Sequence, residues 1–562
     1  MENHFINKAG IKVMIGYLAV FVLYLQLSVI FQSCIQNSPH YCSSENGVVG
    51  AGRKGSAEAG IQILNKGGNA ADGAAATILA LSITDFGAYC IGGEVPLIHY
   101  DAKTKKVKVF SGMGTAPHDP EAIQWYYENG IPPGDLKAAA VPAVIDLIVT
   151  ILQQYGSMSF EDITQPSLTL LDRGSESWHP NLAATFNRLI DAEKNTSGSR
   201  NEKLQAVSDR FYRGDIADEL FAWYSQMGGL LTREDLAAHH THIEEPVTIN
   251  YRGYQIYKCE TWTQGPVLCQ ALQLLEGFDL KSMGHNSDQY IHTVIEALKL
   301  AMADRDTYYG DPLFIDVPLK ELLSEDYNSV RRKLIDMDSA SHIPRPGDPV
   351  NMKPLIDGGK YESWPKGTTT CVVADKFGNF VAATPSGWGN NDETGGKTGV
   401  THGTRLISLN TTPGHPNRIE AGKRPRITLT PTMVLKEGHP VMAISVAGGD
   451  IQDQTTLQIL LNIIEFGMDP FEAVNAPRFA NYLHQDSFDP NPVRSRTIAD
   501  PPNLQINLET DPKTIEMLQS RGHVIDQVKG AIGVPAIALV DEKGMIYAAT
   551  DTKTGHEVSS SE

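Results

Sequence analysis

The sequence predicts an α+β fold in which two antiparallel β-sheets lie between layers of helices, a four-layer αββα sandwich. Two observations predict this fold. Strand-like pairs joined by short polar turns occur in both halves of the chain, and helical patterns lie between them. No repeat or low-complexity linker interrupts residues 47–551. We therefore expect one large fold, and the 562-residue chain is long enough to bury a sizeable core.

Four pairs of runs carry the sheet prediction, because apolar and β-branched residues recur in them and a polar turn separates the two members of each pair. The pairs are Leu97–Tyr100 with Val107–Phe110, Thr369–Ala374 with Phe380–Thr384, Thr432–Lys436 with Val441–Val446, and Ala536–Val540 with Met545–Ala549. Three of these pairs follow Pro365, so strands are expected to be denser in the second half of the chain.

The helix prediction depends on capping residues and on apolar spacing. Helices are expected at Ser56–Asn65 with Ser56 as the N-cap, at Ala70–Ser82, in several segments between Ala143 and Met227, after the N-cap Ser287, and at Thr455–Phe466. The alanine-rich second helix is suited to close packing against a sheet.

Composition excludes some classes of function. The formal net charge is −19, which argues against nucleic-acid binding because such proteins need a basic surface. None of the six cysteines forms a CxxC pair, so a zinc site is not expected. We also expect no other metal and no cofactor. A disulfide between Cys259 and Cys269 is left open by the sequence.

The N-terminal residues 1–34 are predicted to be an export signal or a membrane anchor. Lys8 and Lys12 precede Val13–Phe31, a run without charged residues. Cys34 follows a small residue, which resembles the lipidated cysteine of bacterial lipoproteins, and the run is also long enough to span a bilayer uncleaved. We expect an exported protein with a tether at residues 35–46, in contact with a membrane only through this segment.

The segment Lys366–Cys371 contains three consecutive threonines after a glycine. An N-terminal threonine supplies its own catalytic base, because its free α-amine titrates near pH ~8 and accepts the hydroxyl proton. The peptide bond before such a threonine must first be cut, and a preceding glycine tolerates the strained geometry of that step. Taken alone, the segment fits a plain strand as well.

A second candidate feature is Ala447–Asp450, where two glycines follow a strand and precede a helix. The N–H groups of Gly448 and Gly449 can converge without side-chain hindrance, and the helix dipole adds positive potential. This arrangement suits an oxyanion hole. Asp450 and Asp453 are interpreted as helix N-terminal capping residues rather than metal ligands.

Ordered segments along nearly the whole chain after residue 46 resemble the γ-glutamyltransferase (γ-glutamyltranspeptidase) family of N-terminal-nucleophile hydrolases. The similar segments are Ala57–Gly60, Gly67–Asp72, Ile91–Gly93, Gly229–Leu236, Leu275–Phe278, Ala303–Asp306, Gly310–Pro312, Asp375–Asn379, Lys423–Pro425, Pro431–Thr432 and Ala476–Phe479. The run Gly448–Gln454 is most similar to an acylase-like branch of the family.

The resemblance implies specific roles for residues of this chain. The family nucleophile lies seven residues before the aspartate of the hairpin turn, which selects Thr368 from Asp375 and places self-cleavage between Gly367 and Thr368. A precursor would then give a large subunit, 47–367, and a small subunit, 368–562. The resemblance also implies Gly448 and Gly449 as the oxyanion hole, Ser386 as a hydrogen-bond partner of the nucleophile, and Thr384 and Thr428 as substrate-side hydroxyls.

The recognition residues of the family are not matched. Met113 stands where an arginine that binds the substrate α-carboxylate is expected, and Pro413–Pro416 stands where a carboxylate is expected. The glycine-rich turn continues as Glu94–Pro96, and Gly387–Asn391 departs as well. Residues that could replace the arginine are Arg405, Lys423, Arg424 and Arg426, although each is more commonly a framework charge.

We therefore expect a self-processing amidohydrolase or acyltransferase that cleaves a small-molecule amide other than a γ-glutamyl compound. Two alternatives stay open. One is a true γ-glutamyltransferase or glutathione hydrolase with a rebuilt glutamyl pocket. The other is a non-catalytic exported binding protein that keeps the fold.

Overall fold

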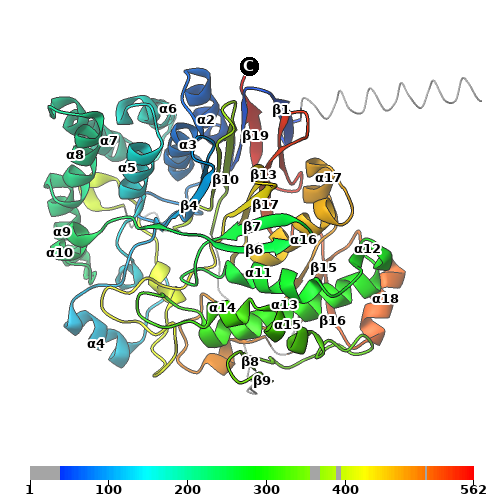
Figure 1. The fold of residues 1–562 in the computed structure, drawn as a ribbon. Coiled ribbons are helices and arrows are strands. Elements are labelled where there is room, and N and C mark those ends of the chain that lie inside the picture. The colour runs from blue at the N-terminus through cyan, green and yellow to red at the C-terminus, as the bar shows by residue number, and fades with distance from the viewer. Residues whose placement is uncertain (1–37, 355–366, 388–393, 500, 502) are drawn as a thin grey trace, which may run out of the picture.

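The computed structural model describes residues 38–354, 367–387, 394–499, 501 and 503–562, and it contains two seven-stranded antiparallel sheets (Figure 1). The first sheet has the order β1 (Tyr41–Ser44), β18 (Ile546–Thr550), β17 (Val534–Val540), β13 (His439–Ala447), β12 (Thr432–Lys436), β7 (Tyr254–Lys258) and β6 (Val247–Tyr251). The second has the order β19 (Glu557–Ser560), β2 (Gly47–Ala51), β10 (Cys371–Asp375), β11 (Phe380–Ala383), β3 (Leu97–Asp101), β4 (Lys106–Phe110) and β5 (Ile243–Glu244).

Alternate residues of the central strands enter two different cores, as the two-residue period of a strand requires. In β10, Val373 packs in the core under the first helix layer, whereas Val372 and Ala374 pack in a core that also contains Ala443 and Ala538 of the opposite sheet. The sheets therefore face each other, and each buries its other face under helices. The predicted four-layer αββα sandwich of the N-terminal-nucleophile type is confirmed.

The helix layers lie on the outer faces of the two sheets (Figure 1). The layer on the second sheet contains α2 (Ser56–Asn65), α3 (Ala70–Thr84), α5 (Val144–Gln154), α6 (Phe160–Arg173), α7 (His179–Asn195), α8 (Arg200–Tyr212), α9 (Asp215–Met227) and α10 (Arg233–Ala238). The layer on the first sheet contains α11 (Pro266–Leu275), α12 (Leu280–Met283), α13 (Asp288–Tyr308), α14 (Leu319–Leu322), α15 (Glu325–Arg332), α16 (Gln452–Ile464), α17 (Pro470–Asn475) and α18 (Pro512–Ser520).

The remaining elements lie around this frame. They are α4 (Pro120–Asn129), a small sheet of β14 (Phe479–Asn481), β15 (Asn503–Asn507) and β16 (Val524–Val528), and a two-stranded pair, β8 (Gly347–Asp348) and β9 (Lys353–Pro354). Among the described residues, no helix is both long and apolar enough to cross a membrane.

All four predicted strand pairs and the predicted helices are present, with small shifts at their ends. Two capping predictions are wrong. The N-cap of α2 is Gly55, and the hydroxyl of Ser56 instead donates to the carbonyl oxygen of Arg53 at 2.7 Å. The N-cap of α16 is Ile451, and Asp450 and Asp453 form buried ion pairs rather than caps. Cys259 and Cys269 are both buried free thiols.

Both large sheets combine strands from either side of Gly367. The first sheet takes β1, β6 and β7 from before this residue and β12, β13, β17 and β18 from after it. The second likewise pairs β2 with β10 and β19, and β3 with β11. A cut after Gly367 would therefore leave two chains that share both sheets.

Candidate active site

Two hairpin turns fix which end of the sandwich holds the predicted site. The β10–β11 turn at Asp375–Gly378 and the β12–β13 turn at Glu437–His439 line the same cavity. Because β11 and β13 both run away from these turns, the ends of both strands lie at the opposite end of the sandwich. A hydrogen bond of 3.0 Å joins the hydroxyl of Thr384, directly after β11, to that of Ser445, near the end of β13.

The three consecutive threonines have three different partners. Thr369 Oγ1 donates to Asp85 Oδ1 at 3.1 Å, and Thr370 Oγ1 lies 2.8 Å from His556 Nδ1. Thr368 Oγ1 donates to the carbonyl oxygen of Gly367 at 2.8 Å. Only the hydroxyl of Thr368, of these three, therefore lies against the peptide bond that the prediction expects to be cut. Thr368 is half-buried, whereas the other two are fully buried.

Ser386 lies beside Thr368 and contacts the same carbonyl group. The two residues form an antiparallel bridge, and their hydroxyl oxygens are 3.3 Å apart. Ser386 Oγ donates to the carbonyl oxygen of Gly367 at 2.7 Å. The structure thus brings the predicted nucleophile, its predicted partner and the predicted cleavage site together.

A buried ion pair between Glu94 and Arg405 contacts the hydroxyl of Ser386. Arg405 Nη2 donates to Ser386 Oγ at 2.5 Å, and Arg405 Nε donates to Glu94 Oε1 at 2.6 Å. Burial raises the pKa of the Glu94 carboxyl, and the Arg405 charge opposes this rise. The sequence singled out Glu94 as a departure and Arg405 as a possible substrate cation, but it did not predict that they pair.

The glycine turn has a backbone that other residues rarely adopt. Gly448 has φ 146° and Gly449 has φ 64°, and a Cβ atom on Gly448 would lie 2.9 Å from Ile451 Cγ1. The turn follows β13 directly and leads into α16, so its N–H groups lie at the positive end of a helix dipole. The role of Gly448 and Gly449 as an oxyanion hole stays a prediction.

Thr428 lies next to this turn through Gln452. With its amide oriented to satisfy its neighbours, Gln452 donates to the carbonyl oxygens of Thr428 and Val446, both at 2.9 Å, and accepts a longer bond of 3.3 Å from Gly449 N–H. The hydroxyl of Thr428 is fully buried and has no hydrogen-bond partner among the described residues. An unpaired buried hydroxyl is uncommon in a folded protein, and the predicted contact of Thr428 with a substrate stays a prediction.

Met113 is a core residue in this structure. It is 2% exposed and packs in the apolar core between the sheets, together with residues such as Ile98 and Leu406. An apolar thioether in this position offers no charge to a substrate carboxylate. Its role in substrate binding stays a prediction.

The four candidate replacement cations differ in their partners. Arg405 pairs with Glu94, Lys423 with Glu420, and Arg424 with Asp311 and Glu244. Arg426 instead donates from Nη1 to the hydroxyl of Ser487 at 2.8 Å, and its Nε bonds to no described residue. Burial lowers the pKa of Arg426 to about 9, helped by the nearby charge of Arg305.

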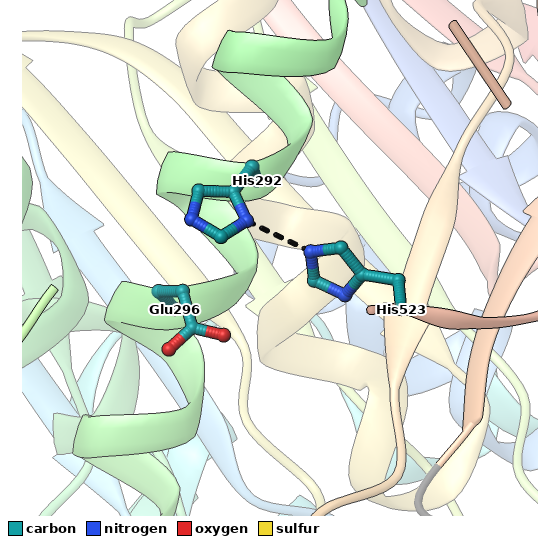
Figure 2. A group of neighbouring side chains, drawn as sticks. All are labelled: His292, Glu296 and His523. Atoms are coloured by element: carbon teal, nitrogen blue, oxygen red, sulfur yellow. Dashed lines mark hydrogen bonds between the residues drawn. The ribbon is translucent and has the colours of Figure 1, made fainter. Parts of the chain in front are cut away.

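Figure 2 shows the one group of three described His, Cys, Asp or Glu residues whose atoms are close enough to share a metal ion: His292, Glu296 and His523. His292 Nδ1 and His523 Nε2 are 2.8 Å apart and hydrogen bond to each other. Glu296 already accepts from Lys299 Nζ at 2.8 Å and from Arg345 Nη2 at 2.6 Å. A divalent cation would have to compete with two side-chain cations, so these donors fit a buried hydrogen-bond network better than a metal site.

The chain is similar over most of its length to known proteins. The chain matches the family described as Gamma-glutamyltranspeptidase over residues 56–196 and 176–561. It is 28% identical to the glutathione hydrolase-like YwrD proenzyme of Bacillus subtilis, a match covering 92% of this chain and 96% of that protein. It is 29% identical to the acylase ACY 1 proenzyme of Pseudomonas sp. strain SE83, covering 78% of this chain and 82% of that protein.

A solved structure of cephalosporin acylase from Bacillus halodurans has the same fold, with a TM-score of 0.77, 25% identity, and coverage of 93% of this chain and 97% of that one. The relatives are named as enzymes and proenzymes, and this finding disfavours the non-catalytic alternative. The chain therefore belongs to the gamma-glutamyltranspeptidase family of N-terminal-nucleophile hydrolases, and it is a self-processing enzyme that acts on a small-molecule amide.

Proposed function

We propose that Thr368 is the nucleophile and that the chain is cut between Gly367 and Thr368 into subunits 47–367 and 368–562. This proposal is based on the contact of Thr368 Oγ1 with the Gly367 carbonyl oxygen. Ser386 Oγ contacts the same carbonyl oxygen. Thr369 and Thr370 face Asp85 and His556 instead.

Once the chain is cut, the freed α-amine of Thr368 acts as the base. It accepts the hydroxyl proton while Oγ attacks the substrate carbonyl carbon, and the N–H groups of Gly448 and Gly449 stabilise the oxyanion. The substrate C–N bond then breaks, and the amine departs with a proton. Water or an acceptor amine attacks the resulting ester and releases the acyl group.

We further propose that the preferred substrate is an acylated amine without a free α-amino-acid head group. Met113 is apolar and buried, and three of the four nearby cations already have carboxylate partners. The acylase names of two relatives support the same substrate class.

A panel of chromogenic donors tests this proposal, with glutaryl, adipyl and phenylacetyl anilides compared with γ-glutamyl anilide. We expect kcat/KM for the best simple acyl anilide to exceed that for γ-glutamyl anilide by roughly a hundredfold, because the α-carboxylate of the γ-glutamyl group would lose its bidentate arginine partner. Efficient turnover of γ-glutamyl anilide would contradict the proposal.

Arg426 favours one alternative, a γ-glutamyltransferase with a rebuilt pocket. Its guanidinium has an Nε that no described residue uses, and it lies two residues before the unpaired hydroxyl of Thr428. If this alternative holds, Arg426→Met lowers kcat/KM only for donors that carry a carboxylate. An equal loss for phenylacetyl anilide, which has no carboxylate, would show that Arg426 serves the framework.

The N-terminal prediction concerns residues 1–34, which lie outside the described residues. We propose that this segment exports the protein and that Cys34 carries a lipid, on the sequence pattern alone. Cell fractionation and mass spectrometry of the mature N-terminal peptide test both points. A cytoplasmic protein that begins at Met1 would contradict export, and an exported protein with an unmodified Cys34 would contradict lipidation.

A further inference from the structure

A chain of three short contacts leads from a buried carboxylate to the peptide bond that the proposed function expects to be cut. Glu94 Oε1 accepts from Arg405 Nε at 2.6 Å, Arg405 Nη2 donates to Ser386 Oγ at 2.5 Å, and Ser386 Oγ donates to the Gly367 carbonyl oxygen at 2.7 Å. Glu94 is 2% exposed, Arg405 is 6% exposed and Ser386 is fully buried.

Arg405 fixes the direction of the Ser386 hydroxyl. A guanidinium has donors only, so the lone pair of Ser386 Oγ faces Arg405 and its proton must point elsewhere. Among the described residues, the oxygens that hydrogen bond to the Ser386 hydroxyl are the Gly367 carbonyl oxygen at 2.7 Å and Thr368 Oγ1 at 3.3 Å. The shorter contact is the one to the carbonyl that Thr368 would attack.

Glu94 holds this arrangement in two ways. Its backbone N–H donates to the Ser386 carbonyl oxygen at 2.9 Å, and the Ser386 N–H donates to the Glu94 carbonyl oxygen at 2.9 Å. Its side chain fixes Arg405, which also lies over the ring of Phe488 at 5.4 Å. Without Glu94, the buried charge of Arg405 would have no carboxylate partner and the fold would be strongly destabilised. The two residues are therefore treated as one unit in the test below.

We propose that the Glu94–Arg405 pair is a positioning device for self-cleavage, which makes the Ser386 hydroxyl a preorganised donor to the developing oxyanion on Gly367. This inference rests on the proposed cut at Thr368. Glu94 and Arg405 are positioning residues, because they act through Ser386 and touch none of the reacting atoms.

Self-cleavage of the Gly367–Thr368 bond consumes no reactant other than water. Thr368 Oγ forms a bond to the Gly367 carbonyl carbon, the carbonyl oxygen takes up negative charge, and Ser386 donates to it. The hydroxyl proton of Thr368 passes to its own amide nitrogen as the C–N bond breaks, which leaves an ester. Breaking the C–N bond frees the Thr368 amine, and water then cleaves the ester to give a Gly367 carboxylate and restore the Thr368 hydroxyl.

The device serves maturation more than turnover. After the cut, the Gly367 carbonyl is no longer fixed beside Ser386, and the hydroxyl is free to bond to Thr368 Oγ. The substrate oxyanion is expected at Gly448 and Gly449 instead. Loss of the pair should therefore slow self-cleavage more than it slows amide hydrolysis by the mature enzyme.

A cycle of variants tests this role. The full chain is made by a short pulse of cell-free synthesis, and self-cleavage is followed on denaturing gels for the wild type, Glu94→Gln/Arg405→Gln, Ser386→Ala and the triple variant. We expect the double variant and Ser386→Ala each to slow cleavage roughly tenfold to a hundredfold, as losses of one oxyanion donor do. In the Ser386→Ala chain, removal of the pair should cause no further slowing.

Controls separate positioning from folding. Arg478→Gln/Asp551→Asn removes another buried ion pair, one that does not contact Ser386, and should leave cleavage within about threefold of wild type. Arg405→Lys keeps a charge beside Glu94 but lacks the forked donors, so its cleavage rate should be intermediate at an unchanged melting temperature. If the double variant does not fold, Arg405→Lys decides the question.

Three results would overturn the inference: wild-type cleavage rates in a folded double variant or in Arg405→Lys, additive slowing in the Ser386→Ala background, or equal losses in cleavage rate and in kcat of the mature fraction. A wild-type chain that is not cut before Thr368 would instead contradict the proposed function.

Discussion

The proposed reaction centre (Thr368, Ser386, Gly448 and Gly449) differs in its contacts from the proposed recognition residues, which are called the recognition wall below (Met113, Arg426 and Thr428). In the proposed reaction centre, both hydroxyls contact one carbonyl group, and both glycines have positive φ angles. In the recognition wall, the thioether is packed in the core, and the Thr428 hydroxyl and Arg426 Nε have no described partner. Amide cleavage demands a fixed geometry, whereas recognition can change with single side chains.

The largest expected effect comes from Thr368, the one threonine of the proposed reaction centre. Thr368→Ala should abolish self-cleavage and amide hydrolysis, because no other hydroxyl contacts the Gly367 carbonyl from within the threonine run. Thr369→Ala is the matched control, and it should still be cut before Thr368. A denaturing gel and a donor assay check both variants. Cleavage of the Thr368→Ala chain would show that another residue is the nucleophile.

The glycine turn gives the next largest effect. Gly449→Ala should lower kcat roughly a hundredfold with a smaller change in KM, because a Cβ at φ 64° shifts the N–H donor that meets the oxyanion. Gly438→Ala is the control, since Gly438 has a similar φ of 78° in the distant β12–β13 turn. Equal steady-state losses in the two variants would mean that the effect is general backbone strain.

Met113→Arg tests whether one residue separates the recognition wall from that of a γ-glutamyl enzyme. A guanidinium placed in the apolar core between the sheets should lower the free energy of unfolding by about 3 kcal/mol, and γ-glutamyl anilide hydrolysis should not rise. Met113→Leu should cost less than about 1.5 kcal/mol. Denaturant unfolding and donor kinetics measure these effects. A stable Met113→Arg enzyme with new γ-glutamyl activity would contradict our account of the wall.

The smallest effect concerns pH and two histidines, His556 beside Thr370 and His415 within the field of Arg426. Burial lowers the pKa of His556, which contacts Thr370, to about 4, and burial together with Arg494 and Arg426 lowers that of His415 to about 3. In the unfolded chain both protonate near pH 6.5. Their contribution to stability is therefore complete above about pH 6.5 and is lost as the pH falls towards 4.

Melting temperatures measured from pH 7.5 to 4.5 should accordingly fall, and His556→Gln and His415→Gln should each flatten the curve. His439→Gln, in an exposed turn, is the control and should not flatten it. A melting temperature that stays constant across this range would show that these histidines do not resist protonation in the folded state.

Much of the frame follows from local sequence. The hairpin turn at Asp375–Asn379 and the apolar alternation around it predict β10 and β11, and the family spacing from that turn selects Thr368. Local patterns failed where long-range pairing dominates. Asp450 looked like a helix cap, but it meets Arg305, which lies far away in the chain and has no local signal.

The same limit applies to the site. Glu94 and Arg405 are separated by 311 positions in the chain. The sequence shows Glu94 only as a departure from the family pattern and Arg405 only as a candidate cation, and their pairing is evident only from the fold. The partners of Thr369 and Thr370, Asp85 and His556, were missed for the same reason. Pair contacts between distant residues depend on the packing of whole layers, which a single sequence does not display.

The most direct test of the central claim is the N-terminal sequence of the smaller fragment of the purified wild-type protein. We expect two fragments on a denaturing gel, with the smaller one beginning Thr-Thr-Thr-Cys at Thr368. A single uncut chain, or a fragment that begins at Thr369 or elsewhere, would contradict it.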